Sequence, residues 1–458
     1  MDKKIMAVAV VALVVIAGIG AVIALGGGDG GKSYGASLNQ DSRLTIFGNA
    51  NGDDYLDQRD VDAVKAIIAG EQEAEYFDCY LTYGGNPVKR SFADANADGK
   101  IDQADVQLIQ DMVDRKQHMQ IKFYDVDGVV SSCTYPLTTA AVGYKSNYEA
   151  LLACNAADTV AYVCDQVGNN GSYSKWYSMF LGENVKCYGS RFTPDYEVFK
   201  DNPPSYFLSG TRAWFDQNME ETVAPLGMDV VRLPFWENNG AASAVITLGY
   251  LIGHESEAYA YAEKADYVYN TISDALKNVP LSERPLVFAS YNGTSISSMH
   301  NGIHELVTSA GGRTVIDEGY TKGSIDQEAL ALTIKPDWII LDQYFGFLET
   351  YETQDKTHAK IVDALVNTDK KYVQAINMTD AYKNGNVLFL QQGIYMGPAS
   401  YIAVAYVANH IWGDKFDFDV DGMLKDYIET YHSDYKFEDF NEIEYFDLAQ
   451  LNEYLAKN

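Results

Sequence analysis

Two short acidic segments between residues 44 and 117 hold the side chains with the clearest capacity for chemistry. Each segment has oxygen-bearing side chains at positions 1, 3, 5, 9 and 12 of a twelve-residue stretch. These residues are Asn49, Asn51, Asp53, Asp57 and Asp60 in the first segment, and Asp94, Asn96, Asp98, Asp102 and Asp105 in the second. Calcium prefers six to eight oxygen ligands, and a tight loop with oxygens at alternate positions supplies them. We therefore expect two Ca²⁺ sites.

Positions 6 and 7 of the segments refine this expectation. Position 7 contributes a backbone carbonyl to calcium, so Tyr55 and Lys100 need no side-chain oxygen there. At position 6 the second segment has Gly99, whereas the first has Asp54, which adopts left-handed backbone at some cost. The second site is therefore expected to be the stronger one. Apolar residues with helical spacing follow each segment and predict one helix after each loop.

The paired loops resemble a type I dockerin, in which two calcium loops are each followed by one helix and carry Asp at position 12. The resemblance covers residues 44–117 and implies a small all-α module that binds Ca²⁺. It also implies a cohesin-like partner, which dockerins often recognise through a Ser-Thr pair at positions 10 and 11. Gln58-Arg59 and Gln103-Ala104 stand at these positions, so the resemblance implies calcium binding more strongly than a cohesin partner.

Composition limits the classes of partner. The 458 residues include 64 Asp and Glu against 34 Lys and Arg, for a formal net charge of −30. Because phosphate binding needs basic patches, nucleic acid is not expected as a partner. The five cysteines show no Cys-x-x-Cys spacing, which argues against a zinc cluster and leaves one or two disulfides open if the compartment is oxidising. They are Cys79, Cys133, Cys154, Cys164 and Cys187.

The N-terminus has the pattern of a membrane anchor. Lys3 and Lys4 precede an uncharged apolar run over residues 5–25, which is long enough to span a bilayer. We predict a single-pass anchor over residues 1–28, with a cleaved signal peptide as the alternative. The lysines place the N-terminus inside the cell, so the bulk of the chain is expected to be extracytoplasmic. A Gly-rich stretch over residues 29–43 reads as a flexible linker.

The remaining residues are organised around one long helix. Residues 254–279 contain no Gly or Pro and repeat apolar side chains with helical spacing, with Ser256 as a plausible N-cap. Similar segments flank it on both sides, each with a short helix, a proline and an apolar strand. The first runs from Glu197 past Pro204 to Leu208, and the second runs from Glu328 past Pro336 to Leu341. This pattern predicts two similar α/β lobes joined by one helix.

The two-lobed region resembles the class III periplasmic substrate-binding proteins of ABC importers. The resemblance covers most of residues 120–415, and one departure is Ser205, where the family usually has Asp. It rests on residues 147–152, 248–253, 310–312, 334–340 and 397–398. It implies two Rossmann-like lobes, at about 120–252 and 281–458, on either side of a stiff helix at 254–279. It also implies an iron–siderophore, haem or cobalamin ligand and an importer permease as partner.

The ligand is expected between the lobes, in loops at the strand ends. Aromatic side chains suit large planar chelates, and Arg suits their carboxylates. The candidate ligand-binding residues are Trp176, Arg191, Arg212, Trp214, Tyr291, His300, Tyr344, Phe345 and Tyr395. From the family resemblance, Glu197 and Glu328 would each pair with an arginine of the permease.

Two other function classes stay open at this stage. A cell-surface scaffolding or adhesion protein would act through dockerin–cohesin binding. A receptor for bare zinc or manganese ions would use His300 and His304, which lie four residues apart on a predicted helix. An enzyme is not expected, because the chain has no nucleophile elbow, no phosphate-binding glycine loop and no plausible Cys–His pair.

Overall fold

The computed structural model describes residues 43–168, 181–238, 240–291, 295–296, 302–320, 323–324, 327–342, 376–432, 436–439 and 445–457. The predicted anchor over residues 1–28 lies outside these ranges, as does the linker up to residue 42. Among the described residues, no helix combines the length and apolar character needed to cross a bilayer.

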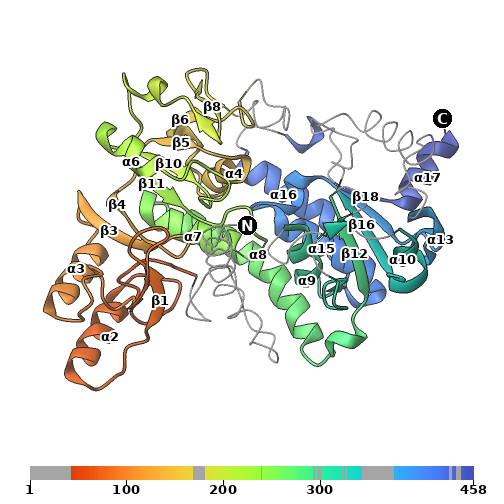
Figure 1. Ribbon diagram of the computed structural model, residues 1–458, viewed down its shortest axis with the longest axis horizontal. Helices are drawn as coiled ribbons and strands as arrows, with labels where there is room; N and C mark the ends of the chain where they lie inside the picture. Colours follow the sequence, from red (N-terminus) through yellow and green to blue (C-terminus); the bar gives the residue numbers. More distant parts are fainter. Residues whose placement is uncertain are drawn as a thin grey trace, which may run out of the picture.

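Two five-stranded sheets form two α/β lobes (Figure 1). In lobe 1 all neighbouring strands are parallel, in the order β11-β10-β5-β6-β7. Lobe 2 has the order β14-β12-β16-β17-β18, in which only β18 is antiparallel. The strands are Ala140–Val142 (β5), Val160–Val163 (β6), Lys186–Cys187 (β7), Tyr206–Ser209 (β10), Asp229–Arg232 (β11), Leu286–Ser290 (β12), Arg313–Thr314 (β14), Trp338–Asp342 (β16), Val387–Leu390 (β17) and Tyr445–Asp447 (β18). Continuous apolar strands of this kind are typical of sheets covered by helices on both faces, and the predicted α/β class is confirmed.

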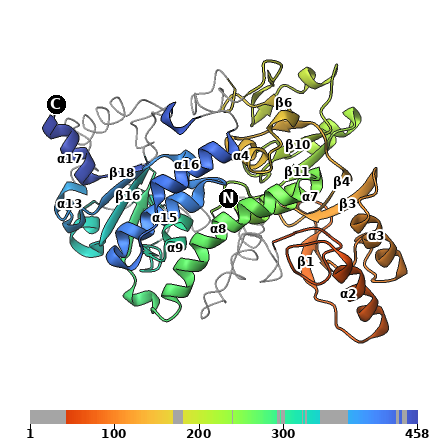
Figure 2. The same cartoon turned by 180° about the vertical axis from the view of Figure 1, so that it is seen from behind.

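One long helix, α8 (Glu255–Leu276), connects the lobes (Figure 2). It buries a single face through Ala258, Tyr261, Ala265, Val268 and Ile272, among others, as the spacing predicts. It directly follows α7 (Ala241–Ile252), whose residues are all buried. The predicted N-cap is wrong: His254 occupies that position, and the Ser256 hydroxyl donates to Glu257 instead. The helix also ends three residues before the predicted boundary.

The repeated flanks of the long helix take equivalent places in the two lobes. A 3₁₀ turn over Tyr196–Phe199 precedes β10, and α10 (Gln327–Ala329) with a π-helical turn over Leu330–Ile334 precedes β16. Both strands lie inside their sheets. The remaining helices are α4 (Lys145–Ala153), α6 (Met219–Val223), α9 (Gly302–Ser309), α13 (Asp380–Lys383), α14 (Gln392–Tyr395), α15 (Ser400–Ile411), α16 (Val420–Tyr431) and α17 (Leu448–Lys457).

The N-terminal acidic region forms a compact module beside lobe 1 (Figure 1). Helices α2 (Gln58–Ala69) and α3 (Gln103–Val113) follow the two acidic loops, as predicted, and pack on each other. Between them lies a hairpin that the sequence analysis left unassigned, β1 (Phe77–Tyr80) with β2 (Pro87–Arg90). A second hairpin, β3 (Met119–Tyr124) with β4 (Val130–Tyr135), leads into lobe 1.

The module shares a core with lobe 1. Leu44, Ile46 and Met112 belong to the same buried apolar cluster as the residues of lobe 1 and α8. The module is therefore an integral part of the two-lobed body from residue 44 onward. Its cysteine and those of lobe 1 are all free thiols, so the disulfides left open above are absent among these five described residues.

Candidate functional site

The loops at the carboxyl ends of the parallel strands bring the two lobes together. In open α/β sheets, ligands bind outside these strand ends. Asn238, which follows β11, donates from its backbone N–H to Glu305 Oε2 of α9 at 3.0 Å and from Nδ2 to the Gly302 carbonyl at 2.8 Å. The Tyr269 hydroxyl of α8 donates to the Asn238 carbonyl at 3.0 Å. Asn238 thus joins lobe 1, the connecting helix and lobe 2.

A second junction lies at Gly397, before α15. Its φ is +141°, and an added Cβ would collide with Glu149 Oε2 of α4. The Tyr261 hydroxyl of α8 donates to the neighbouring Pro398 carbonyl at 2.9 Å. Only glycine gives lobe 1 this close an approach to the backbone of lobe 2, which explains the Gly-Pro pair that the sequence analysis noted.

A buried pair of opposite charges also crosses between the lobes. Lys145 begins α4 at the end of β5, and Asp342 ends β16; both are almost completely buried. Burial raises the pKa of Asp342 to about 7, although a hydrogen bond donated by the Tyr395 hydroxyl and the charge of Lys145 both oppose the increase. Neither residue was predicted as a site residue, because neither is distinctive in the sequence before the ends of β5 and β16 are brought together.

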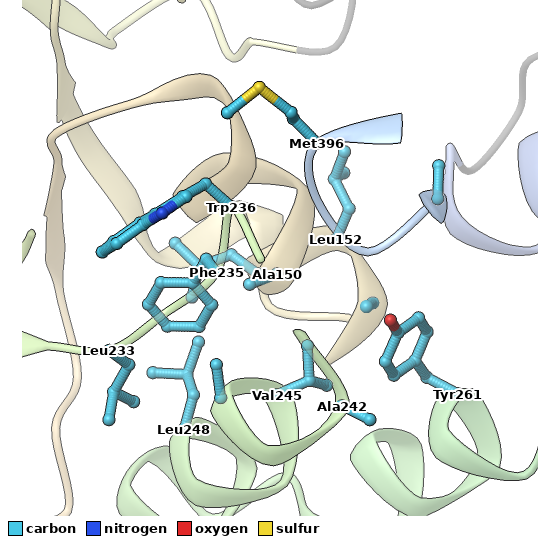
Figure 3. Packing of buried hydrophobic residues seen from close by; sticks show 14 of the residues in the cluster. Ala150, Leu152, Leu233, Phe235, Trp236, Ala242, Val245, Leu248, Tyr261 and Met396 are labelled. Atoms are coloured by element: carbon cyan, nitrogen blue, oxygen red, sulfur yellow. The ribbon is translucent and has the colours of Figure 1, made fainter. Parts of the chain in front are cut away.

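Aromatic side chains from four of these loops gather near the junctions. Trp214 follows β10 and is 40% exposed, and its ring centroid lies 5.4 Å from that of buried Trp236, which follows β11. In lobe 2 the Tyr291 hydroxyl donates to Met396 Sδ at 3.4 Å, and its ring lies 6.3 Å from that of Tyr395. Figure 3 shows Trp236 and Met396 bordering the same packed region. Of these residues, Trp214, Tyr291 and Tyr395 were predicted.

The two predicted arginines have different surroundings. The Arg191 guanidinium carbon lies 4.2 Å from the ring centroid of Tyr144 and 5.6 Å from that of Phe215. Its Nε atom is buried and has no hydrogen-bond partner among the described residues. These rings follow the carboxyl ends of β5 and β10, so Arg191 lies against aromatic rings at this end of lobe 1.

Arg212, in contrast, is engaged by acidic side chains of the β3–β4 turn and of α6. Its guanidinium donates to Asp125 at 2.9 Å, to Asp127 at 2.9 Å and to Glu220 at 2.6 Å, and the side chain is only 5% exposed. Three acidic partners neutralise its charge, so this residue holds the loop after β10 and is not presented to a ligand.

Several predicted residues are not brought into this region by the described structure. Trp176, His300, Tyr344 and Phe345 lie outside the described residues. His304 is buried on α9, and the described part of the chain contains no cluster of three or more His, Cys, Asp or Glu side chains placed to hold a metal ion. Glu197 and Glu328 are exposed just before β10 and β16, and Glu197 pairs with Lys200 at 2.6 Å.

The second acidic loop has its oxygen atoms turned inward. Asp94 accepts hydrogen bonds from the backbone N–H groups of Asp98 and Gly99 at 3.0 and 2.8 Å, and Asp105 accepts from Asn96 and Asp102 at 3.2 and 2.9 Å. Gly99 has a φ of +96°. Burial raises the pKa of both Asp94 and Asp105. Calcium ligation by this loop stays a prediction, because the described residues hold no cluster of three or more His, Cys, Asp or Glu side chains placed to hold a metal ion.

The first loop has the same spacing but different partners. Arg59 pairs with Asp53 at 2.6 Å and with Asp57 at 2.8 Å. Asp54, at position 6, is not among the described residues with positive φ, unlike Gly99, and its carboxylate pairs with Arg43. Three of the loop's carboxylates are therefore balanced by arginines.

Comparison with known proteins identifies the fold. No known protein-family model matches the sequence, and no curated protein matches it. The TroA-like periplasmic binding protein FepB from Veillonella parvula superposes with a TM-score of 0.56 at 13% identity, covering 71% of this chain and 99% of that one. The molybdate-bound periplasmic binding protein MolA from Haemophilus influenzae gives 0.54 at 14% identity, covering 69% and 99%. Nickel-bound CeuE from Helicobacter pylori gives 0.51 at 15% identity, covering 69% and 97%. The chain therefore has the fold of TroA-like periplasmic binding proteins.

Proposed function

We propose that this chain is an extracytoplasmic substrate-binding protein that captures a metal chelate and presents it to an ABC importer. The observation that carries the proposal is the arrangement of two lobes whose strand ends meet beside α8, with Trp214, Trp236, Tyr291 and Arg191 at the meeting loops. The residues predicted over 1–28 would anchor it in the membrane, and the acidic loops would bind Ca²⁺, most strongly in the second.

The chemistry of these loops favours a chelate over a bare ion. Aromatic rings offer apolar faces to a large planar ligand, and a guanidinium pairs with its carboxylates. An ion without a chelator needs several converging His, Cys, Asp or Glu ligands, and the described residues hold no such cluster. Iron–siderophore, haem and cobalamin compounds all match the aromatic and cationic character of the loops.

The connections between the lobes favour capture with little hinge motion. Helix α8 is continuous from lobe 1 to lobe 2, and Asn238 and Gly397 each fix contacts across the junction. Packed interfaces of this kind resist continuous deformation. Exposed Glu197 and Glu328, one on each lobe, would then present a fixed pair of charges to arginines of the permease, which favours orientation and association rate.

Fluorescence titration with haem, cobalamin and ferric siderophores tests the proposal on the full-length chain. We expect saturable quenching by one class at micromolar concentration or below. Replacing Trp214 with Ala should weaken binding about tenfold, which corresponds to about 1.4 kcal/mol. Tyr267→Ser is the control, since Tyr267 is an aromatic residue 64% exposed on α8. Binding that is equal in Trp214→Ala and wild type, or saturable binding of zinc or manganese alone, would argue against a chelate at these loops.

A scaffolding function is the second candidate. It is favoured by the exposure of Gln58, Arg59, Gln103 and Ala104 at the starts of α2 and α3, where dockerin-like modules would meet a cohesin. A cohesin panel tested in calcium and in chelator distinguishes the two: calcium-dependent capture supports scaffolding, and no capture by any cohesin leaves chelate transport as the function.

A further inference from the structure

The loop after β10, residues 210–216, carries Trp214 and is held from outside lobe 1. Asp127, in the turn of the β3–β4 hairpin, accepts a 2.5 Å hydrogen bond from the Thr211 hydroxyl and a 2.9 Å bond from the Arg212 backbone N–H. The Trp214 backbone N–H donates in turn to the Thr211 carbonyl at 3.0 Å. The position of Trp214 therefore depends on a turn that precedes lobe 1 in the sequence.

The N-terminal acidic module holds that turn. Tyr80 of β1 donates its backbone N–H to the Gly128 carbonyl at 2.9 Å and forms a bridge with Val129. Tyr83, at the tip of the β1–β2 hairpin, has its ring centroid 5.2 Å from the guanidinium carbon of Arg212. The hairpin between the two acidic loops thus touches both the turn and the loop that the turn fixes.

The same hairpin is joined to the second acidic loop by Arg90 of β2. Its Nε donates to the Ala97 carbonyl at 3.1 Å, and it lies 3.7 Å from the carboxylate of Asp94, the first residue of the loop. The Arg90 side chain is 14% exposed and that of Asp94 only 2%. Arg90 therefore joins β2 to the second loop by a mostly buried contact.

The opposite side of the module is fixed to α8. Asp54 pairs with Arg43, which also pairs with Asp266 at 2.7 Å. The Tyr259 hydroxyl donates to the Asp54 carbonyl at 2.7 Å, and the rings of Tyr55 and Tyr259 lie 4.5 Å apart. The module is therefore attached to α8 on one side and to the loop after β10 on the other.

We propose that Tyr83 and Arg90 are positioning residues for ligand capture: the hairpin of the module holds residues 210–216 in the binding conformation, and Arg90 fixes that hairpin against the second acidic loop. The module then serves the receptor within the same chain. The consequence for chelate affinity rests on the proposed function, whereas the consequence for loop order does not.

Hydrogen–deuterium exchange of the full-length chain tests the proposal without any chelate. Tyr83→Ala should speed amide exchange in residues 210–216 about tenfold. Arg90→Met should also speed exchange there, because it removes the contacts of β2 with Asp94 and with the Ala97 carbonyl. Lys89→Met is the matched control, since Lys89 lies next to Arg90 on β2 and only pairs with Asp78 at the surface.

Two outcomes would overturn the proposal. One is unchanged exchange over residues 210–216 in Tyr83→Ala. The other is equal exchange over residues 210–216 in Arg90→Met and Lys89→Met, provided that exchange in the cores of α2 and α3 shows both variants to be folded. Chelate titration of the same proteins tests the proposed function separately: protection of residues 210–216 without any chelate binding would contradict the proposed function alone.

Discussion

Arg59 distinguishes two acidic loops that have nearly the same spacing. It neutralises Asp53 and Asp57 in the first loop, whereas Ala104 stands at the equivalent position of the second. We therefore expect native mass spectrometry at micromolar calcium to show one Ca²⁺ per chain, and two in Arg59→Ala. Lys65→Ala controls for the loss of a positive charge on α2. Two ions in the wild type, or one in Arg59→Ala, would contradict this role of Arg59.

Asp342 makes stability depend on pH. Its pKa is raised to about 7 by burial, above the usual value near 3.8. The folded state therefore binds more protons than the unfolded state between these values, and the stability contributed by this group falls as pH rises from about 4 to 7. Asp342→Asn should raise the melting temperature relative to wild type by a few degrees more at pH 8 than at pH 5. Parallel pH curves for the two proteins would refute this, and exposed Asp380→Asn serves as the control.

Single residues of the site could be predicted from the sequence only where the residue type alone indicated a binding role. Trp214, Tyr291 and Arg191 are large aromatic or cationic residues just after apolar strands, and all three lie near the meeting loops. Lys145 and Asp342 could not be found, because their approach depends on bringing together the ends of β5 and β16, which lie in different sheets and far apart in sequence. Arg212 was wrongly predicted to bind the ligand, because its acidic partner Asp125 lies 87 residues away and the sequence does not show that the two side chains meet.

At the scale of elements, the turn before α15 sets the distance between the lobes. Gly397→Ala combines an unfavourable positive φ with a collision against Glu149, and should lower the free energy of unfolding by about 1–3 kcal/mol. Gly385→Ala is the matched control, since Gly385 has a φ of +85° but nothing within 4 Å of an added Cβ. Chemical denaturation measures both. Equal losses in the free energy of unfolding would mean that the collision of the new Cβ with Glu149 does not contribute to the effect of Gly397→Ala.

Helices and strands were predicted where hydrophobic periodicity was long or the apolar run continuous. The predicted helix over residues 254–279 corresponds to α8, and the apolar runs before and after it correspond to β10 and β16. The hairpin of β1 and β2 escaped prediction because its four-residue strands are half exposed and depend on contacts with β3 and β4. Its contact with residues 210–216 depends on tertiary structure and cannot be predicted from the local sequence.

At the scale of the whole molecule, the two exposed glutamates should govern docking without affecting ligand capture. Glu197→Gln with Glu328→Gln should slow association with the permease about tenfold at low salt, because rim charges act mainly on the association rate. Chelate affinity should be unchanged. Glu263→Gln, which removes an exposed charge from α8, is the control. Surface plasmon resonance on the permease in nanodiscs measures the rate, and an unchanged rate in the double variant would remove the docking role.

The contacts between residues 44–117 and the rest of the chain distinguish this region from a free-standing module. Residues 44–117 resemble a dockerin, a module that usually acts on a separate partner. Here Arg115 pairs with Glu255 at the start of α8, and the Arg115 guanidinium carbon lies 4.3 Å from the ring centroid of Tyr250. Residues 44–117 and lobe 1 therefore share one buried apolar core.

The most direct measurement of the central claim is native mass spectrometry of the full-length chain, in nanodiscs, with an equimolar mixture of haem, cobalamin, a ferric siderophore, zinc and manganese. We expect one chelate bound per chain, from a single class, and displaced from Trp214→Ala at lower collision energy than from wild type. Binding of zinc or manganese in place of every chelate, or of no component of the mixture, would contradict it.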